Sequence, residues 1–201
     1  MSKGWSHEVT PKKRRKLASS AVACRENGAS YLRDADTLAD AGKFDRALAL
    51  AILGEEELAK AFILHSAAFQ QRWDEPLFKS LTQHELKQQL AEAMRIYVKE
   101  AWSFIRSQQH QLVPPPMPSR GAVDQDALRR AMHQARQGKR ERERQKHRSL
   151  YVSINGDGSV DSKPSATEQE YLEAREEARQ MLDVVDSAFE ETRDYAETEV
   201  H

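Results

Sequence analysis

The residues best suited to chemistry lie in an unusually apolar stretch, ALALAILGEEELAKAFIL, at residues 47–64. Its charged side chains are Glu55, Glu56, Glu57 and Lys60. At 3.6 residues per turn, a helix here is apolar on nearly all sides and therefore belongs inside a fold. Buried charges need partners. Because Lys60 follows Glu56 by four residues and Glu57 by three, the spacing suits a Glu to Lys pair.

A second pair of chemically useful side chains, His84 and Lys87, lies one turn apart on the next predicted helix. We expect that helix to pack antiparallel to the first through a short connector at residues 73–76. Because His84 and Lys87 lie about as far from this connector as Glu57 and Lys60 do, the two pairs would meet. Such a set, with either Glu56 or Glu57 as its carboxylate, could supply an acid, a base and an anion contact. The alternative is a buried polar network that locks the helix register. Both interpretations stay open.

The elements that must position these residues follow from apolar spacing, which predicts five helices. They span about residues 13–40, 44–73, 77–110 and 123–147, with a last helix that opens at the capping-box pattern of residues 167–170. A proline-rich connector at 112–120 and a turn-rich loop at 150–165, with the β-prone LYVSI at its start, separate them. We therefore predict an all-α antiparallel bundle with one short β-prone loop before the last helix.

Length and composition favour one domain at residues 13–199 after an N-terminal tail at residues 1–12. The single cysteine, Cys24, excludes an internal disulfide and fits a reducing compartment. The N-terminus lacks the apolar core of a secretory signal. The apolar run at residues 44–64 carries four charges near its middle, which argues against a membrane span. We expect a cytoplasmic protein that does not contact a membrane.

The formal net charge of −1 conceals a strong asymmetry along the chain. Residues 129–148 hold nine Lys and Arg against two Glu, whereas residues 166–199 hold twelve Asp and Glu against three Arg. The basic segment could form a phosphate-binding surface. Alternatively, the two segments lie side by side and neutralise each other.

Three short patterns, taken in order, give the chain a resemblance to a known family. They are E-E-L-x-K at residues 56–60, His84 and Lys87 within LTQHELKQ, and K-x-R-x-L-Y-V at residues 146–152. With these patterns the chain, over about residues 18–189, resembles the AbiV family, bacterial abortive-infection proteins of the HEPN superfamily. The resemblance implies a HEPN-like helical bundle that acts as a homodimer against phage. It also implies an RNA partner (tRNA, mRNA or rRNA) and a phage-encoded activator.

The superfamily often cuts RNA without a metal, so the resemblance implies neither a metal nor a cofactor. Its nuclease signature is an Arg separated from a His by four to six residues, and His147 meets it with Arg142 or Arg140. The His could move a proton of the ribose hydroxyl or leaving oxygen while the Arg holds the phosphate. On an unbroken helix, however, Arg140, Arg144 and His147 share a face and Arg142 points about 140° away. Catalysis by Arg142 therefore requires the helix to end before His147.

We thus expect a metal-independent endoribonuclease that arrests translation or growth, or else a non-catalytic HEPN-fold protein that binds RNA, the ribosome or a phage protein. The candidate catalytic residues are Arg142, His147, Arg140, His84 and Glu57. The candidate RNA contacts are Lys139, Arg144, Lys146, Arg148, Lys60 and Lys87. Which of Glu55, Glu56 and Glu57 is the key carboxylate stays open.

Overall fold

The computed structural model describes most of the chain as a set of packed helices. It describes residues 9–69, 73, 75–108, 135, 142–150, 157, 159 and 166–198, except for the side chains of residues 76–77, 80, 84–85, 99–108 and 191–198. All secondary structure in these ranges is helical, which confirms the all-α prediction. None of the helices found there combines the length and hydropathy needed to cross a membrane.

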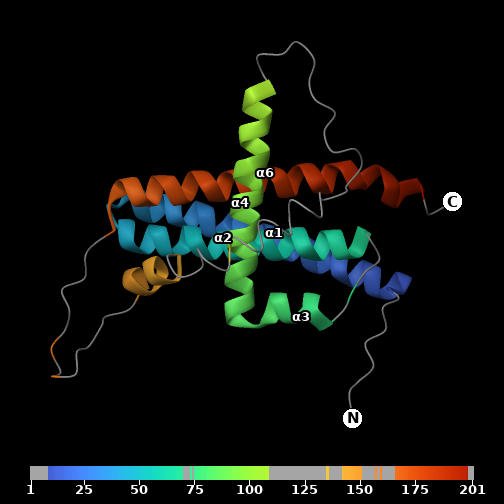
Figure 1. The fold of residues 1–201 in the computed structure, drawn as a ribbon, viewed down its shortest axis with the longest axis horizontal. Coiled ribbons are helices and arrows are strands. Elements are labelled where there is room, and N and C mark those ends of the chain that lie inside the picture. The colour runs from blue at the N-terminus through green and yellow to red at the C-terminus, as the bar shows by residue number, and fades with distance from the viewer. Residues whose placement is uncertain are drawn as a thin grey trace.

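The first two helices form a long hairpin. Helix α1, Pro11–Asp40, is capped by Thr10, whose hydroxyl accepts the Lys13 N–H, and it carries Pro at its first turn. The chain reverses at Gly42, whose φ of 70° is a conformation that glycine adopts without strain. Helix α2, Phe44–Phe69, then returns alongside α1 (Figure 1).

Helix α2 is the centre of the molecule, because sixteen of its 26 residues are buried. Helix α6, Glu168–Thr198, runs along α2 and closes the core (Figure 1). Its capping box forms as predicted, since Thr167 and Glu170 each accept the backbone N–H of the other. The inner face of α6 packs into the core. Tyr171, Ala174, Ala178, Met181 and Val185 are buried, and Ala188 packs against the same core.

The prediction of a third helix at residues 77–110 was wrong about its continuity and about its packing direction. This stretch forms two helices, α3 at Glu75–Thr82 and α4 at His84–Gln108. The Thr82 hydroxyl donates back to the Phe78 carbonyl, a bond that favours a bend, and the Gln83 carbonyl starts the next helix by accepting the Lys87 N–H. As a result α4 crosses α2 and α6 instead of running antiparallel to α2 (Figure 1).

The fourth predicted helix, residues 123–147, is described at Ala135 and over the helical segment 142–150. This helical segment continues through His147 to Leu150. The proline-rich connector at 112–120 and most of the β-prone loop lie outside the described residues.

Two glycines let α1 and α2 approach closely. A Cβ added at Gly28 would lie 2.8 Å from Leu58 Cγ and 3.3 Å from the Gly54 carbonyl oxygen. A Cβ added at Gly54 would meet Gly28 O and Leu32 at 3.4 Å, which is an ordinary contact distance. The helix crossing therefore requires glycine at position 28 but not at position 54.

The pair gives a matched test of this packing. Gly28→Ala should lower the free energy of unfolding by about 1–3 kcal/mol, because Leu58 must move. Gly54→Ala should be neutral or stabilising by up to about 1 kcal/mol, because alanine favours the helix. Denaturant unfolding of both variants measures the difference. Equal effects of the two substitutions would show that this close contact does not limit the packing.

Candidate functional site

The three consecutive glutamates of α2 point in different directions and each meets its own cation. Glu55 and Glu56 are buried, with 2% and 5% of their surface exposed, whereas Glu57 is partly buried. Successive residues lie 100° apart around a helix, so three neighbouring carboxylates face three different packing partners. The three glutamates therefore make three separate contacts, and which of them is the key carboxylate stays open.

Glu56 joins three elements. Lys146 Nζ, in the helical segment 142–150, lies 2.6 Å from Glu56 Oε1. Lys87 Nζ, on α4, lies 3.7 Å from Glu56 Oε2. The predicted meeting of Glu56 with Lys87 is therefore confirmed. Lys146, which the sequence placed among RNA contacts, has 8% of its side chain exposed and serves as an internal partner.

Glu57 and Lys60 form the other pair that the sequence predicted. They lie toward α1, where burial and then Glu57 raise the pKa of the Cys24 thiol. Lys60 thus does not join Glu56 and Lys87 in one cluster. The His84 side chain lies outside the described residues, so its place in that cluster stays a prediction.

Glu55 belongs to a network of three carboxylates and two guanidinium groups. Arg142 Nη2 lies 3.2 Å from Glu55 Oε1 and also donates to Glu177. Arg95 bridges Glu92 and Glu177, with 3.2 Å between Arg95 Nη1 and Glu177 Oε1. These side chains come from α2, α4, α6 and the segment 142–150, so the network holds four elements together.

Sequence reasoning missed three members of this network, Glu92, Arg95 and Glu177. A signal existed for Glu177, which lies three residues after the buried Ala174 and four before the buried Met181 and so belongs to the inner face of α6. Glu92 and Arg95 are spaced as an ion pair on α4. Their link to Glu55 depends on tertiary packing and has no local signal.

Burial raises the pKa of Glu55 to about 7, because the charged carboxylate loses its hydration. Arg142 and Arg95 act to lower this pKa, whereas Glu177 and Glu92 act to raise it. Protonation of Glu55 leaves two carboxylates facing two guanidinium groups, which balances the charge of the network. A cavity of about 10 Å³ lies beside Glu55 and Arg142. It offers about the space of one water molecule, so a ribose or phosphate does not fit there.

The described part of the basic segment divides into inner and outer side chains. Arg142 contacts Glu177, and Arg148 Nη2 lies 2.8 Å from Glu170 Oε1, so the segment does pair with α6 at these two points. Arg144 is exposed. Lys139 and Arg140 lie outside the described residues.

His147 lies on the outer face of the segment 142–150, with 58% of its side chain exposed. Its Nε2 lies 2.7 Å from Glu143 Oε1, one helical turn earlier. Because the segment is one continuous helix, Arg142 and His147 point to different faces. The helix end that Arg142 would need before His147 is not present. Within the described ranges, no group of His, Cys, Asp or Glu is arranged to hold a metal ion.

The raised pKa of Glu55 makes a prediction about stability. The folded protein holds this proton more tightly than the unfolded chain between pH 4.5 and 7, so the contribution of Glu55 to stability is lost as pH rises through 7. Glu55→Gln, which imitates the protonated acid, should lie within about 1 kcal/mol of the wild type at pH 5. At pH 8 it should exceed the wild type by up to about 3 kcal/mol in free energy of unfolding.

Asp36 provides the control of opposite sign. Although burial acts to raise its pKa, hydrogen bonds from Arg175, Tyr171 and Arg179 hold it at about 2. Asp36→Asn should therefore lower stability by the same amount at pH 5 and pH 8. A Glu55→Gln variant that loses stability at pH 8 would contradict the assignment of a protonated Glu55.

Comparison with known proteins places this arrangement in a family. No curated protein and no solved structure matches the chain. The family model HEPN_AbiV, described as AbiV, matches residues 16–183, which include the three glutamates of α2, the helical segment 142–150 and Glu177 of α6. The chain therefore belongs to the AbiV family of HEPN proteins.

Proposed function

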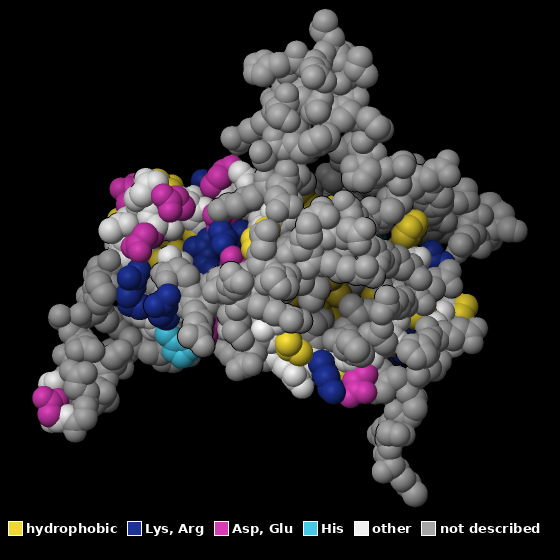
Figure 2. Space-filling model, viewed as in Figure 1, with side chains coloured by type: hydrophobic (Ala, Val, Ile, Leu, Met, Phe, Trp, Pro, Cys, Tyr) yellow, Lys and Arg dark blue, Asp and Glu magenta, His cyan; other side chains and the backbone are white. Residues whose placement is uncertain are grey.

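We propose that this AbiV-family chain is an abortive-infection effector that cleaves RNA without a metal ion. Family membership supports the role in abortive infection. The observation that carries the choice of chemistry is the exposed imidazole of His147, held by Glu143 on a basic helix. Figure 2 shows a His side chain at the surface beside Lys and Arg side chains, in the region where Figure 1 draws the segment 142–150.

The chemistry requires a group that moves a proton and a cation that stabilises the phosphate. His147 can accept the proton of a ribose 2′-hydroxyl, and its contact with Glu143 orients the ring. Arg144 lies three residues earlier on the same exposed face and can contact the phosphate as charge develops. Arg140 precedes His147 by seven residues, a spacing that returns to the same face on a continuous helix. Arg142, neutralised by Glu55 and Glu177, is better suited to positioning the helix.

A homodimer would complete this site. Strand cleavage by transphosphorylation needs one group that removes a proton and another that donates one. A single helix face with one imidazole supplies one of them. A second copy would add the other imidazole and would close a shallow surface into a cleft. We include RNA as the substrate class, a phage-encoded activator and a cytoplasmic location in the same proposal.

A non-catalytic binding protein is the second candidate, and one observation favours it. Arg142, the arginine with the shortest permitted spacing to His147, is neutralised inside the fold. In that case the exposed face with Arg144 and His147 would bind RNA, the ribosome or a phage protein without cutting it. Glu57 and His84 would then have structural roles.

Cleavage of RNA by the purified full-length chain in the presence of EDTA tests the proposal. The wild type should cut, and His147→Ala should slow cleavage by about 100-fold or more, as loss of a general acid or base does. Arg144→Ala should also reduce the rate. Arg15→Ala, which removes one exposed positive charge from α1, is the matched control and should cut normally.

Expression of the same variants during phage infection separates the two candidates. Growth arrest with cleaved RNA that requires His147 supports the nuclease. Growth arrest with intact RNA, unchanged in His147→Ala, supports the binding protein and overturns the nuclease. Cleavage that survives His147→Ala but is lost in His84→Ala would move the chemistry to α4.

A further inference from the structure

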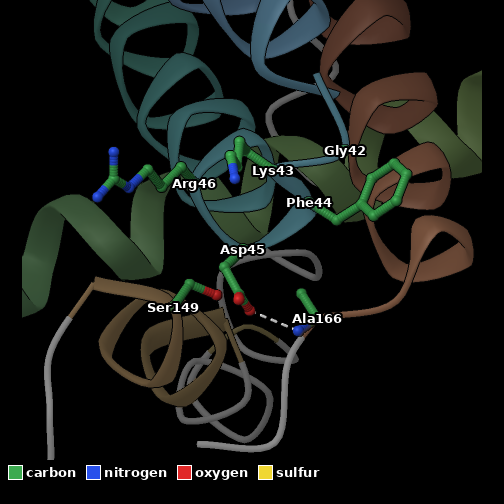
Figure 3. Close-up of a pocket in the computed structure, with 7 residues that line it drawn as sticks. All are labelled: Gly42, Lys43, Phe44, Asp45, Arg46, Ser149 and Ala166. Atoms are coloured by element: carbon green, nitrogen blue, oxygen red, sulfur yellow. Dashed lines mark hydrogen bonds between the residues drawn. The ribbon is translucent and has the colours of Figure 1, made fainter. Parts of the chain in front are cut away.

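A cavity of about 540 Å³ opens at the turn between α1 and α2 (Figure 3), and none of the buried glutamates lines it. Its volume falls in the range of small-molecule sites. Its walls come from the turn, the first residues of α2, the end of the segment 142–150 and Ala166, two residues before α6. The lining residues are Gly42, Lys43, Phe44, Asp45, Arg46, Ser149 and Ala166.

Ser149 contributes a buried hydroxyl to the wall of this cavity. The residue is 4% exposed, and its Oγ has no hydrogen-bond partner among the described residues. In Figure 3 its hydroxyl points across the cavity toward Asp45. A buried hydroxyl without a partner is unfavourable, so most such groups in folded proteins are satisfied by protein, water or ligand. A ligand oxygen in the cavity would satisfy this one.

The start of α2 gives the cavity an attraction for anions. The backbone N–H groups in the first turn of this 26-residue helix have no intrahelical acceptor, and the helix dipole places partial positive charge there. The exposed Lys43 and Arg46 add two positive charges to the wall. Phosphate groups bind at helix N-termini for these combined reasons.

Asp45 restricts which phosphate compound fits. Its Oδ1 accepts the backbone N–H of Ala166, which fixes the carboxylate in the cavity wall (Figure 3). A negative charge there disfavours bare phosphate. It favours a ligand that presents hydroxyl groups beside its phosphate, because a carboxylate accepts hydrogen bonds from ribose hydroxyls.

We propose that the cavity binds the ribose phosphate group of a nucleotide. The phosphate lies at the start of α2 and contacts Lys43, Arg46 and the Ser149 hydroxyl, while ribose hydroxyls donate to Asp45. The proposal does not depend on RNA cleavage, because none of these residues belongs to the face that carries His147.

Binding of small probes to the full-length chain, measured by calorimetry, tests the ligand class. Ribose 5-phosphate and 5′-adenosine monophosphate should bind, and inorganic phosphate should bind at least about tenfold more weakly because it gives Asp45 no hydroxyl. Ribose alone should not bind. Equal binding of inorganic phosphate and ribose 5-phosphate, or no binding of either phosphate ester, would overturn the proposal.

Substitutions test the residues. Ser149→Ala should leave the melting temperature of the free protein unchanged, because Oγ has no partner to lose, and should weaken ribose 5-phosphate binding about three- to tenfold. Asp45→Asn should weaken ribose 5-phosphate binding more than phosphate binding.

Loss of positive charge has a matched control. Lys43→Gln and Arg46→Gln should each weaken binding, whereas Lys12→Gln should not, because Lys12 lies at the opposite end of α1, about 40 Å away along the helix. Unchanged binding in Ser149→Ala, or an equal loss in Lys12→Gln, would show that the cavity is not the binding site.

Discussion

The burial of two carboxylates at the centre of α2 is the constraint on which the rest of this structure depends. Apolar surfaces of helices can pack in several registers at similar free energy, but Glu55 and Glu56 are satisfied only where cations reach them. Those cations come from α4 and from the segment 142–150, and Glu177 of α6 completes the network. The carboxylates therefore fix where four elements meet.

Because of this constraint, the helical segment 142–150 has one face that pairs with the buried carboxylates and another that is exposed. Arg142 and Lys146, four residues apart, face inward and pair with Glu55 and Glu56. Arg144 and His147, three residues apart, face outward. The basic character of the segment is thus partly a requirement of docking and partly a property of its surface. A count of positive charges along the sequence cannot separate the two, because both faces carry arginine or lysine.

Features that depend on interactions between residues close together in the sequence could be predicted, whereas features that depend on distant residues could not. Apolar periodicity and the capping box located α1, α2 and α6, and the helical spacing predicted the pair of Glu57 with Lys60. The break at Gln83, beside the hydrogen bond from the Thr82 hydroxyl to the Phe78 carbonyl, has no periodic signal. Contacts such as that of Glu55 with Arg142, 87 residues apart, require the docked fold. The same holds for the cavity that joins Ser149 to the start of α2.

The buried network is better explained by specificity than by stability. An ion pair in a core gives little net stabilisation, because desolvation offsets most of the attraction, and well-packed apolar residues often replace such pairs without loss. Here the excess carboxylate makes the balance less favourable still, since burial holds the pKa of Glu55 near 7. Any other docking of the segment 142–150 would leave Glu55, Glu56 and Glu177 without Arg142 and Lys146. The network thus penalises wrong arrangements more than it rewards the right one, and it holds the face of His147 in one position.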